Sequence, residues 1–173
     1  MRVIAINGYK SFIGKNFVRK YKKKYKIIHY KKNINNYKNF NLFIKKNNFD
    51  FFIHFASLSR HNCEKNKILC QKTNFEAVKK IIKNLNTLKK KPLFIFISSS
   101  YVYESSKNKL RENSKVNPTT LYGSLKLRCE NYIMNKYKNY CILRLFNIYG
   151  KDQPSTFFIP DIIEKIKKKK IIK

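Results

Sequence analysis

Three residues in the second half of the chain have the types needed for proton transfer. Tyr122 and Lys126 are four positions apart, so they lie on one face if their segment is helical. A neighbouring ammonium group lowers the pKa of a phenol from about 10, which favours tyrosinate near neutral pH. Ser99 ends an apolar run and can donate a hydrogen bond to a substrate oxygen. These residues suggest acid–base chemistry at an oxygen atom, although a surface helix in a chain rich in Tyr and Lys would also contain such a pair.

A second candidate site lies near the N-terminus, where Asn7–Gly14 reads Asn-Gly-Tyr-Lys-Ser-Phe-Ile-Gly. Gly8 and Gly14 are two of only four glycines in the chain. A glycine turn between a strand and a helix directs backbone N–H groups and the helix dipole toward a pyrophosphate. A tight turn that merely packs a helix closely would use the same two glycines, so this pattern alone leaves both interpretations open.

Alternating strands and helices position these residues. Short apolar runs predict five strands, at Val3–Ile6, Lys26–Tyr30, Asp50–Phe55, Pro92–Ile97 and Tyr140–Leu145. Helical spacing of apolar residues predicts helices over Ile13–Tyr21, Phe40–Lys46, Ile68–Leu85, Leu121–Lys138 and Phe157–Lys170.

This alternation predicts an α/β fold, a doubly wound parallel sheet with helices on both faces. Counting strands along the chain, we expect the spatial order 3-2-1-4-5, with Val3–Ile6 inside the sheet. No linker or internal repeat divides the chain, so residues 1–173 form one domain.

The formal charge of +31 raises the question of a nucleic-acid partner. The chain has 34 Lys and only six Arg, and the Lys residues are spread along its whole length. Lys, Asn and Ile are abundant and Gly, Pro and Ala are scarce, which a bias toward A/T-rich codons would produce by itself. Nucleic-acid sites usually rely on Arg and concentrate charge on one face. Composition therefore argues against a dedicated nucleic-acid site.

The cysteines and the hydropathy pattern indicate whether the protein has a metal site or a membrane span. The four cysteines, Cys63, Cys70, Cys129 and Cys141, form no C-x-x-C pair and have no His at zinc-ligand spacing. We therefore expect buried reduced thiols and no metal site. No apolar run approaches the roughly 18 residues that span a bilayer, and the N-terminal run is too short for a signal peptide. The sequence predicts a cytoplasmic protein without a membrane partner.

Taken in order, these segments resemble the extended short-chain dehydrogenase/reductase family, in its NAD-dependent epimerase/dehydratase branch that acts on nucleotide sugars. The resemblance covers essentially the whole chain. It matches Ser99, Tyr122 and Lys126 to the catalytic Ser/Thr, Tyr and Lys, and Leu143–Gly150 to a segment beside nicotinamide and substrate. It implies that Ser99 and Asn147 contact the substrate. Tyr122 would exchange a proton with a sugar hydroxyl while hydride passes between the sugar and the nicotinamide.

The resemblance also implies a site for NAD or NADP. The residues matched to that site are Gly8, Ser11, Phe12, Ile13, Gly14, Lys31, Phe55, Ala56, Asn74, Tyr122 and Lys126. In this scheme Lys126 holds the nicotinamide ribose and lowers the Tyr122 pKa. Lys31 follows the second strand where an acidic residue usually selects NAD, so NADP could be tolerated or preferred.

Three departures from the family pattern affect the predicted function. Ser11 replaces the middle glycine of the turn, where a side chain crowds the pyrophosphate. Ser100 and Tyr101 follow Ser99 where dehydratases of the family have an acidic residue, which favours an epimerase or ketoreductase over a 4,6-dehydratase. Family members also continue for roughly a hundred residues or more into a substrate lobe that this chain lacks. We therefore expect weak dinucleotide binding and no turnover by residues 1–173 alone.

Three classes of function stay open at this point. The first is an NAD(P)-dependent epimerase or reductase for a nucleotide sugar, in precursor synthesis for surface polysaccharides. It would work as a homo-oligomer or with a partner chain that supplies the substrate lobe. The second is an inactive Rossmann remnant, which would bind cofactor without turnover. The third is a basic module for nucleic acid or another polyanion, which would show steep salt dependence and no cofactor binding.

Overall fold

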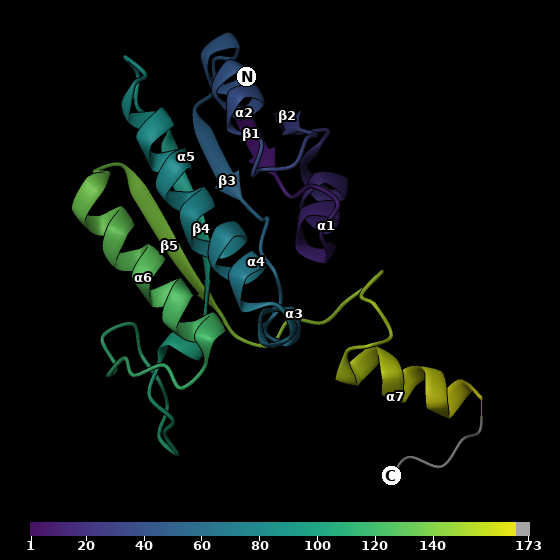
Figure 1. The fold of residues 1–173 in the computed structure, drawn as a ribbon. Coiled ribbons are helices and arrows are strands. Elements are labelled where there is room, and N and C mark those ends of the chain that lie inside the picture. The colour runs from purple at the N-terminus through teal and green to yellow at the C-terminus, as the bar shows by residue number, and fades with distance from the viewer. Residues whose placement is uncertain (169–173) are drawn as a thin grey trace.

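The computed structural model describes residues 1–168 and contains one five-stranded parallel sheet (Figure 1). The strands are β1 (Val3–Asn7), β2 (Lys26–Tyr30), β3 (Phe51–His54), β4 (Leu93–Ser99) and β5 (Tyr140–Leu145). All four strand pairs are parallel. The predicted α/β fold with a parallel Rossmann-type sheet is thus confirmed.

Helices connect successive strands and one further helix follows β5. They are α1 (Phe12–Tyr21), α2 (Tyr37–Lys46), α3 (Arg60–Lys65), α4 (Lys67–Gln71), α5 (Ala77–Asn86), α6 (Leu121–Lys136) and α7 (Phe158–Lys167). A π-helical turn at Lys72–Glu76 joins α4 to α5, and a short 3-10 turn at Ser100–Val102 follows β4. Of the residues expected to extend the last helix, Lys169 and Lys170 lie outside the described residues. None of the helices in residues 1–168 is long and apolar enough to span a bilayer.

The strand order is β2-β1-β3-β4-β5, so the predicted order 3-2-1-4-5 is wrong. β1 lies inside the sheet, as expected, but its second neighbour is β3. The physical reason is burial: Phe52, Ile53 and His54 are all buried, which requires neighbours on both sides and both faces. β2 begins with the exposed Lys26 and tolerates the edge position.

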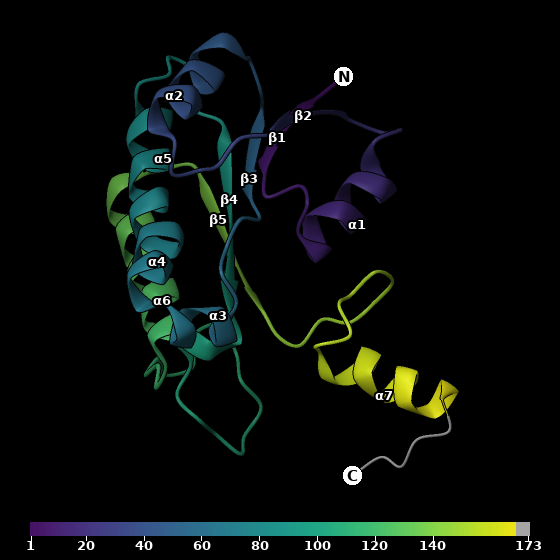
Figure 2. The same cartoon turned by 45° about the vertical axis from the view of Figure 1, so that its right-hand side comes forward.

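The two faces of the sheet are covered unequally (Figure 2). The larger core lies between the sheet and α2, α4, α5 and α6, and includes Phe52, Phe94 and Phe96. On the opposite face, α1 is the one described helix that packs on the strands, through Ile13, Phe17 and Val18 in the smaller core.

The second face is open over β4 and β5. The register aligns Ile95 with Cys141 and Ile97 with Leu143, and paired residues of parallel strands share a face. Leu143 is 41% exposed although it is apolar and lies in the sheet. α7 projects away from the sheet (Figures 1 and 2), and Ile159, Ile163 and Ile166 on it are exposed. The part of the chain after residue 140 therefore presents an apolar surface without a covering element among the described residues.

Two local expectations for the region after β3 are wrong. The helix expected over Ile68–Leu85 is broken into α4, a π-helical turn and α5, and Ile68 is exposed. Cys63 and Cys70 form a disulfide that joins α3 to α4, instead of two buried reduced thiols. The break at Asn66, where the backbone leaves the helical region, brings these two cysteines together. Cys129 and Cys141 are free.

Candidate active site

The glycine turn lies where β1 ends and α1 begins. Gly8 has φ of +71°, a left-handed conformation that side chains rarely adopt, and a Cβ atom there would meet the Ala56 backbone nitrogen at 2.3 Å. Ser11 is the N-cap of α1 and accepts a hydrogen bond from the Gly14 N–H at 3.1 Å. The Ser11 side chain therefore accepts from one backbone N–H group in the first turn of α1. The other N–H groups of that turn are left for a ligand.

Unpartnered polar atoms mark the same edge of the sheet. Among the described side chains, three buried polar atoms have no hydrogen-bond partner: Asn7 Nδ2, His29 Nδ1 and Gln153 Oε1. They belong to the ends of β1 and β2 and to the segment after β5, all at the carboxyl edge. Buried polar groups are normally paired, so these three atoms at one edge are available to hydrogen-bond a ligand. With the free N–H groups of α1, they fit a dinucleotide lying along this edge.

Ser99 and Tyr122 meet at the carboxyl end of β4. Thr120 caps the N-terminus of α6 through the Gly123 N–H, so Tyr122 lies in the first turn of that helix. Close packing places this turn, because a Cβ atom on Gly123 would lie 2.2 Å from the Tyr101 carbonyl oxygen. Ser99 lies close enough to Tyr122 for its hydroxyl to lower the Tyr122 pKa. The structure thus brings together a serine and a tyrosine from distant parts of the chain.

Lys126 lies one helical turn beyond Tyr122 and is almost completely buried. Its Nζ atom donates a hydrogen bond to the Ile97 carbonyl at 2.7 Å and lies 5.6 Å from the centre of the Tyr122 ring. The ammonium group therefore points toward the backbone of β4.

Burial is the main cause of the pKa shifts of Tyr122 and Lys126. It raises the pKa of Tyr122 above its ordinary value, and hydrogen bonds with Ser99 and Ser57 only partly oppose that rise. The expectation that Lys126 lowers the Tyr122 pKa is therefore wrong for this structure. Tyr122 holds its proton at neutral pH. Burial also lowers the pKa of Lys126, to about 8.

The buried Lys126 leads to a prediction on stability. A lysine in the unfolded chain titrates near pH 10.4, so the unfolded state binds more protons than the folded state between about pH 8 and pH 10. The contribution of Lys126 to the free energy of unfolding therefore rises with pH across this window. We expect urea unfolding to show that the free energy of unfolding of the wild type, relative to that of Lys126→Met, rises between about pH 8 and pH 10. A difference that stays constant with pH would contradict a buried ionisable ammonium.

Asn74 is placed where it supports the loop after β3. It lies in the π-helical turn, and its side-chain amide accepts from the Leu58 N–H at 2.7 Å and donates to the Leu58 carbonyl at 3.0 Å. With 2% exposure, it has no free surface for a cofactor. Asn74 therefore fixes the loop that begins at Ala56, which packs against Gly8.

The remaining candidate residues fall into two groups. Phe55, Phe12 and Ile13 use their side chains in packing: Phe55 contacts Phe17 of α1, with ring centroids 5.4 Å apart. Lys31 and Asn147 are exposed at the ends of β2 and β5, both at the carboxyl edge.

Sequence reasoning missed a buried ion pair beside the site. Arg144 of β5 contacts Glu130 of α6 through two nitrogens, with Nη2 2.7 Å from Oε2, and Glu130 also accepts a hydrogen bond from Ser98. Arg144 donates in addition to the Glu112 carbonyl at 3.0 Å. The pair connects the serine-bearing end of β4, α6 and the loop after β4. A signal was present in the sequence, since Glu130 is the only acidic residue in α6.

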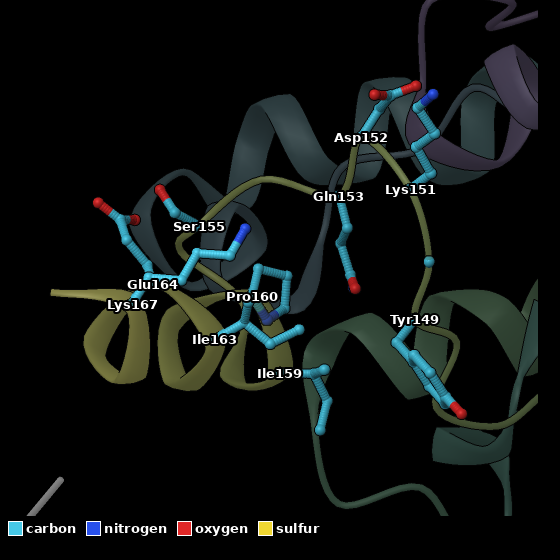
Figure 3. Close-up of a pocket in the computed structure, with 11 residues that line it drawn as sticks. Tyr149, Lys151, Asp152, Gln153, Ser155, Ile159, Pro160, Ile163, Glu164 and Lys167 are labelled. Atoms are coloured by element: carbon cyan, nitrogen blue, oxygen red, sulfur yellow. The ribbon is translucent and has the colours of Figure 1, made fainter. Parts of the chain in front are cut away.

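A cavity of about 450 Å³ lies between α7 and the segment that follows β5 (Figure 3). Ile159, Pro160 and Ile163 form its apolar wall, and Tyr149 lies on the opposite side. The Gln153 side chain points into the cavity and carries the unpartnered Oε1 atom. This cavity extends the carboxyl edge toward the exposed apolar surface. Among residues 1–168, no group of three His, Cys, Asp or Glu side chains could hold a metal ion together.

Comparison with solved structures gives similar folds with low sequence identity. A dTDP-4-dehydrorhamnose reductase from Clostridium acetobutylicum is 24% identical with a TM-score of 0.85, and the match covers 96% of this chain and 60% of that one. The same kind of enzyme from Bacillus anthracis, solved with NADP, is 20% identical with a TM-score of 0.89 and coverages of 99% and 62%. A UDP-glucuronic acid 4-epimerase from Bacillus cereus, solved with UDP-glucuronic acid and NAD, is 20% identical with a TM-score of 0.85 and coverages of 97% and 64%.

Sequence comparison gives a shorter match and a family assignment. The methionine adenosyltransferase 2 subunit beta of Xenopus tropicalis is 36% identical over 56 residues, which are 32% of this chain and 17% of that protein. The chain spans about 60% of the length of the first two solved relatives. Residues 4–173 match the model of the NAD dependent epimerase/dehydratase family. The resemblance seen in the sequence is thereby confirmed, and the chain belongs to the NAD dependent epimerase/dehydratase family.

Proposed function

We propose that the chain binds NAD or NADP along the carboxyl edge of its sheet and acts in the keto reduction or epimerisation of a nucleotide sugar in the cytoplasm. The observation that carries the proposal is the proximity of Ser99 and Tyr122 at that edge, beside a glycine turn. Precursor synthesis for surface polysaccharides is the pathway class we propose for such a product.

The chain's own residues suit the binding of a dinucleotide. The backbone at Gly8 and the first turn of α1 would hold the pyrophosphate, and the loop at Ala56 would lie beside the adenosine half. Lys126 would hold the nicotinamide ribose after leaving the Ile97 carbonyl. When bound, the dinucleotide supplies or accepts the hydride.

Proton transfer is assigned to Tyr122. Because burial keeps its hydroxyl protonated at neutral pH, Tyr122 can donate a proton to a ketone oxygen. Ser99, which lies beside Tyr122, would donate a second hydrogen bond to the same oxygen. Reduction of a ketone needs a proton donor, and Tyr122 is protonated at neutral pH. We therefore favour keto reduction over epimerisation as the reaction.

The reaction type leads to a product prediction. Removal of water from the sugar needs a carboxylate near the catalytic serine, but Ser100 and Tyr101 occupy those positions. We expect chromatography of the products to show reduced or epimerised sugar nucleotides and no 4-keto-6-deoxy sugar nucleotide. Detection of the latter would contradict the assignment.

The exposed apolar surface after residue 140 supports a further binding element. Leu143 on the sheet and Ile159, Ile163 and Ile166 on α7 are exposed, and isolated apolar patches of this kind mark interaction sites. We propose that this apolar surface is an interaction site, for a partner chain or for a second copy of this chain.

Calorimetric titration with NAD and NADP, followed by assays with UDP-, GDP- and dTDP-sugars, tests this function. We expect weak dinucleotide binding by residues 1–173 and turnover only when the remaining substrate-binding part is present. Absence of any dinucleotide binding would overturn the proposed function. Efficient turnover by residues 1–173 alone would show that no further part is needed.

A further inference from the structure

Tyr101, two positions after Ser99, contacts both Ser99 and Tyr122. Its ring packs edge-on against the Tyr122 ring, with ring centroids 5.9 Å apart and ring planes at 85°. Its backbone N–H donates a hydrogen bond to the Ser99 hydroxyl at 3.3 Å. Edge-on packing is a preferred geometry of aromatic pairs, so a fixed Tyr101 ring restricts the orientation of the Tyr122 ring.

The Tyr101 ring is held by a cation from another helix. Tyr101 is 41% exposed, so packing in the protein interior does not fix its side chain. The guanidinium carbon of Arg60 lies over the ring, 5.4 Å from its centre. Arg60 Nη1 also donates a hydrogen bond to the Tyr101 hydroxyl at 3.3 Å. Arg60 therefore contacts both the ring and the hydroxyl of Tyr101.

Arg60 is itself fixed at the start of α3. Its Nε atom donates to Glu64 Oε1 at 3.0 Å, one turn further along the helix. Ser59 caps the N-terminus of α3, and the disulfide between Cys63 and Cys70 joins this helix to α4. Figures 1 and 2 show α3 beside α6 at the carboxyl edge of the sheet. The planar guanidinium group thus connects α3 with the turn that follows β4.

The orientation of Tyr122 decides how well it can transfer a proton. A general acid must lie within hydrogen-bonding distance of the atom that it protonates. A displacement of about 1 Å, caused by a change away from the reacting atoms, can lower the rate by about a hundredfold. A residue that fixes the Tyr122 ring therefore influences the rate without contacting the substrate.

We propose that Arg60 is a positioning residue, which acts through Tyr101 to hold Tyr122 in the orientation that proton transfer requires. The inference rests on the proposed function, in which Tyr122 is the acid. Arg60 stabilises the Tyr101 ring by its two contacts, and the ring in turn limits the movement of Tyr122. This role predicts an effect on kcat and little effect on KM or on dinucleotide binding.

NMR of residues 1–173 with ¹³C-labelled tyrosine rings tests the positioning without the need for turnover. The variants Tyr101→Phe and Tyr122→Phe assign the signals of these two rings. We expect Arg60→Met to shift the signals of both Tyr101 and Tyr122, because the loss of the cation releases the first ring and then the second. Unshifted Tyr122 signals in Arg60→Met would overturn the inference.

Arg128→Met is the matched control, since α6 carries a similar arrangement elsewhere. Arg128 lies over Phe75, 4.2 Å from the ring centre, and Phe75 packs edge-on against Tyr132. Arg128→Met should shift the Tyr132 signals, which Tyr132→Phe assigns, and should leave those of Tyr122 unchanged. If both arginine variants shifted Tyr122 equally, the effect would be a general one of charge, and the specific role of Arg60 would be refuted.

Kinetics of residues 1–173 together with the remaining substrate-binding part tests the consequence for the reaction. Arg60→Met should lower kcat by about tenfold to a hundredfold, with KM and the Kd of NADP nearly unchanged. Arg60→Lys keeps the charge but not the planar group, so it should restore only part of the loss. In a Tyr101→Leu background, Arg60→Met should add little further loss, because the contact through which it acts is already absent.

The outcomes separate this inference from the proposed function. Additive losses from Arg60→Met and Tyr101→Leu, or a raised KM with unchanged kcat, would show that Arg60 does not act through Tyr101 and would overturn the inference alone. Failure of NAD and NADP to bind the wild type, or a wild-type kcat in Tyr122→Phe, would overturn the proposed function itself.

Discussion

Replacing Tyr122 by Phe is expected to lower kcat for keto reduction by about 10²- to 10⁴-fold, the usual contribution of a positioned acid. The change removes only the hydroxyl that lies beside Ser99 and that holds a proton at neutral pH. The assay uses residues 1–173 together with the remaining substrate-binding part, because we expect no turnover without it. KM should change little, since substrate binding would rest mainly on other groups.

Tyr132→Phe provides the matched control for Tyr122→Phe. Tyr132 lies on the same helix, with its ring packed edge-on against Phe75 and away from Ser99. Its hydroxyl has no part in the proposed chemistry, so kcat should stay near the wild-type value. In the wild type, kcat should fall as pH rises past the raised pKa of Tyr122. Equal kcat values for the two variants would contradict the assignment of Tyr122 as the acid.

Replacing Arg144 by Met is expected to lower the free energy of unfolding by about 3–5 kcal/mol, because it leaves the Glu130 carboxylate buried without its cation. The Glu130 side chain is 1% exposed and would keep only the Ser98 hydroxyl as a partner. Urea unfolding at neutral pH measures the loss. The double variant Glu130→Gln with Arg144→Met should recover part of it, since no unpaired charge then remains.

The control is an ion pair at the surface. Arg19 and Asp152 are 2.8 Å apart but both side chains are more than 40% exposed. Arg19→Met should therefore cost no more than about 1 kcal/mol. If Arg144→Met were no more destabilising than Arg19→Met, the pair of Arg144 and Glu130 would not be the buried contact described here.

Apolar runs and helical spacing predicted the strands and most helices, because both patterns report directly on burial. The order of the strands was missed although a signal was available in β3. Phe51–His54 is apolar on both faces, which suits an interior strand and not the edge position expected for it. The disulfide between Cys63 and Cys70 depends on a helix break at Asn66, which cysteine spacing does not report.

The candidate site was predictable in its residue types but not in its electrostatics. The i and i+4 spacing correctly placed Tyr122 and Lys126 on one helix. It could not show that Lys126 donates to the Ile97 carbonyl, or that burial raises the Tyr122 pKa. Asn74 was matched to a cofactor contact, whereas its amide is used by the Leu58 backbone and by Cys63 Sγ. Sequence spacing does not encode these contacts between elements.

Amide hydrogen exchange with and without saturating NADP tests most directly whether the carboxyl edge of the sheet is a dinucleotide site. The account predicts slower exchange in residues 8–14, at the glycine turn, and in residues 56–59, in the loop that Asn74 fixes. Exchange on the outer face of α2, including Lys45, should not change. Unchanged exchange at both segments, or protection spread over the lysine-rich surface, would contradict it.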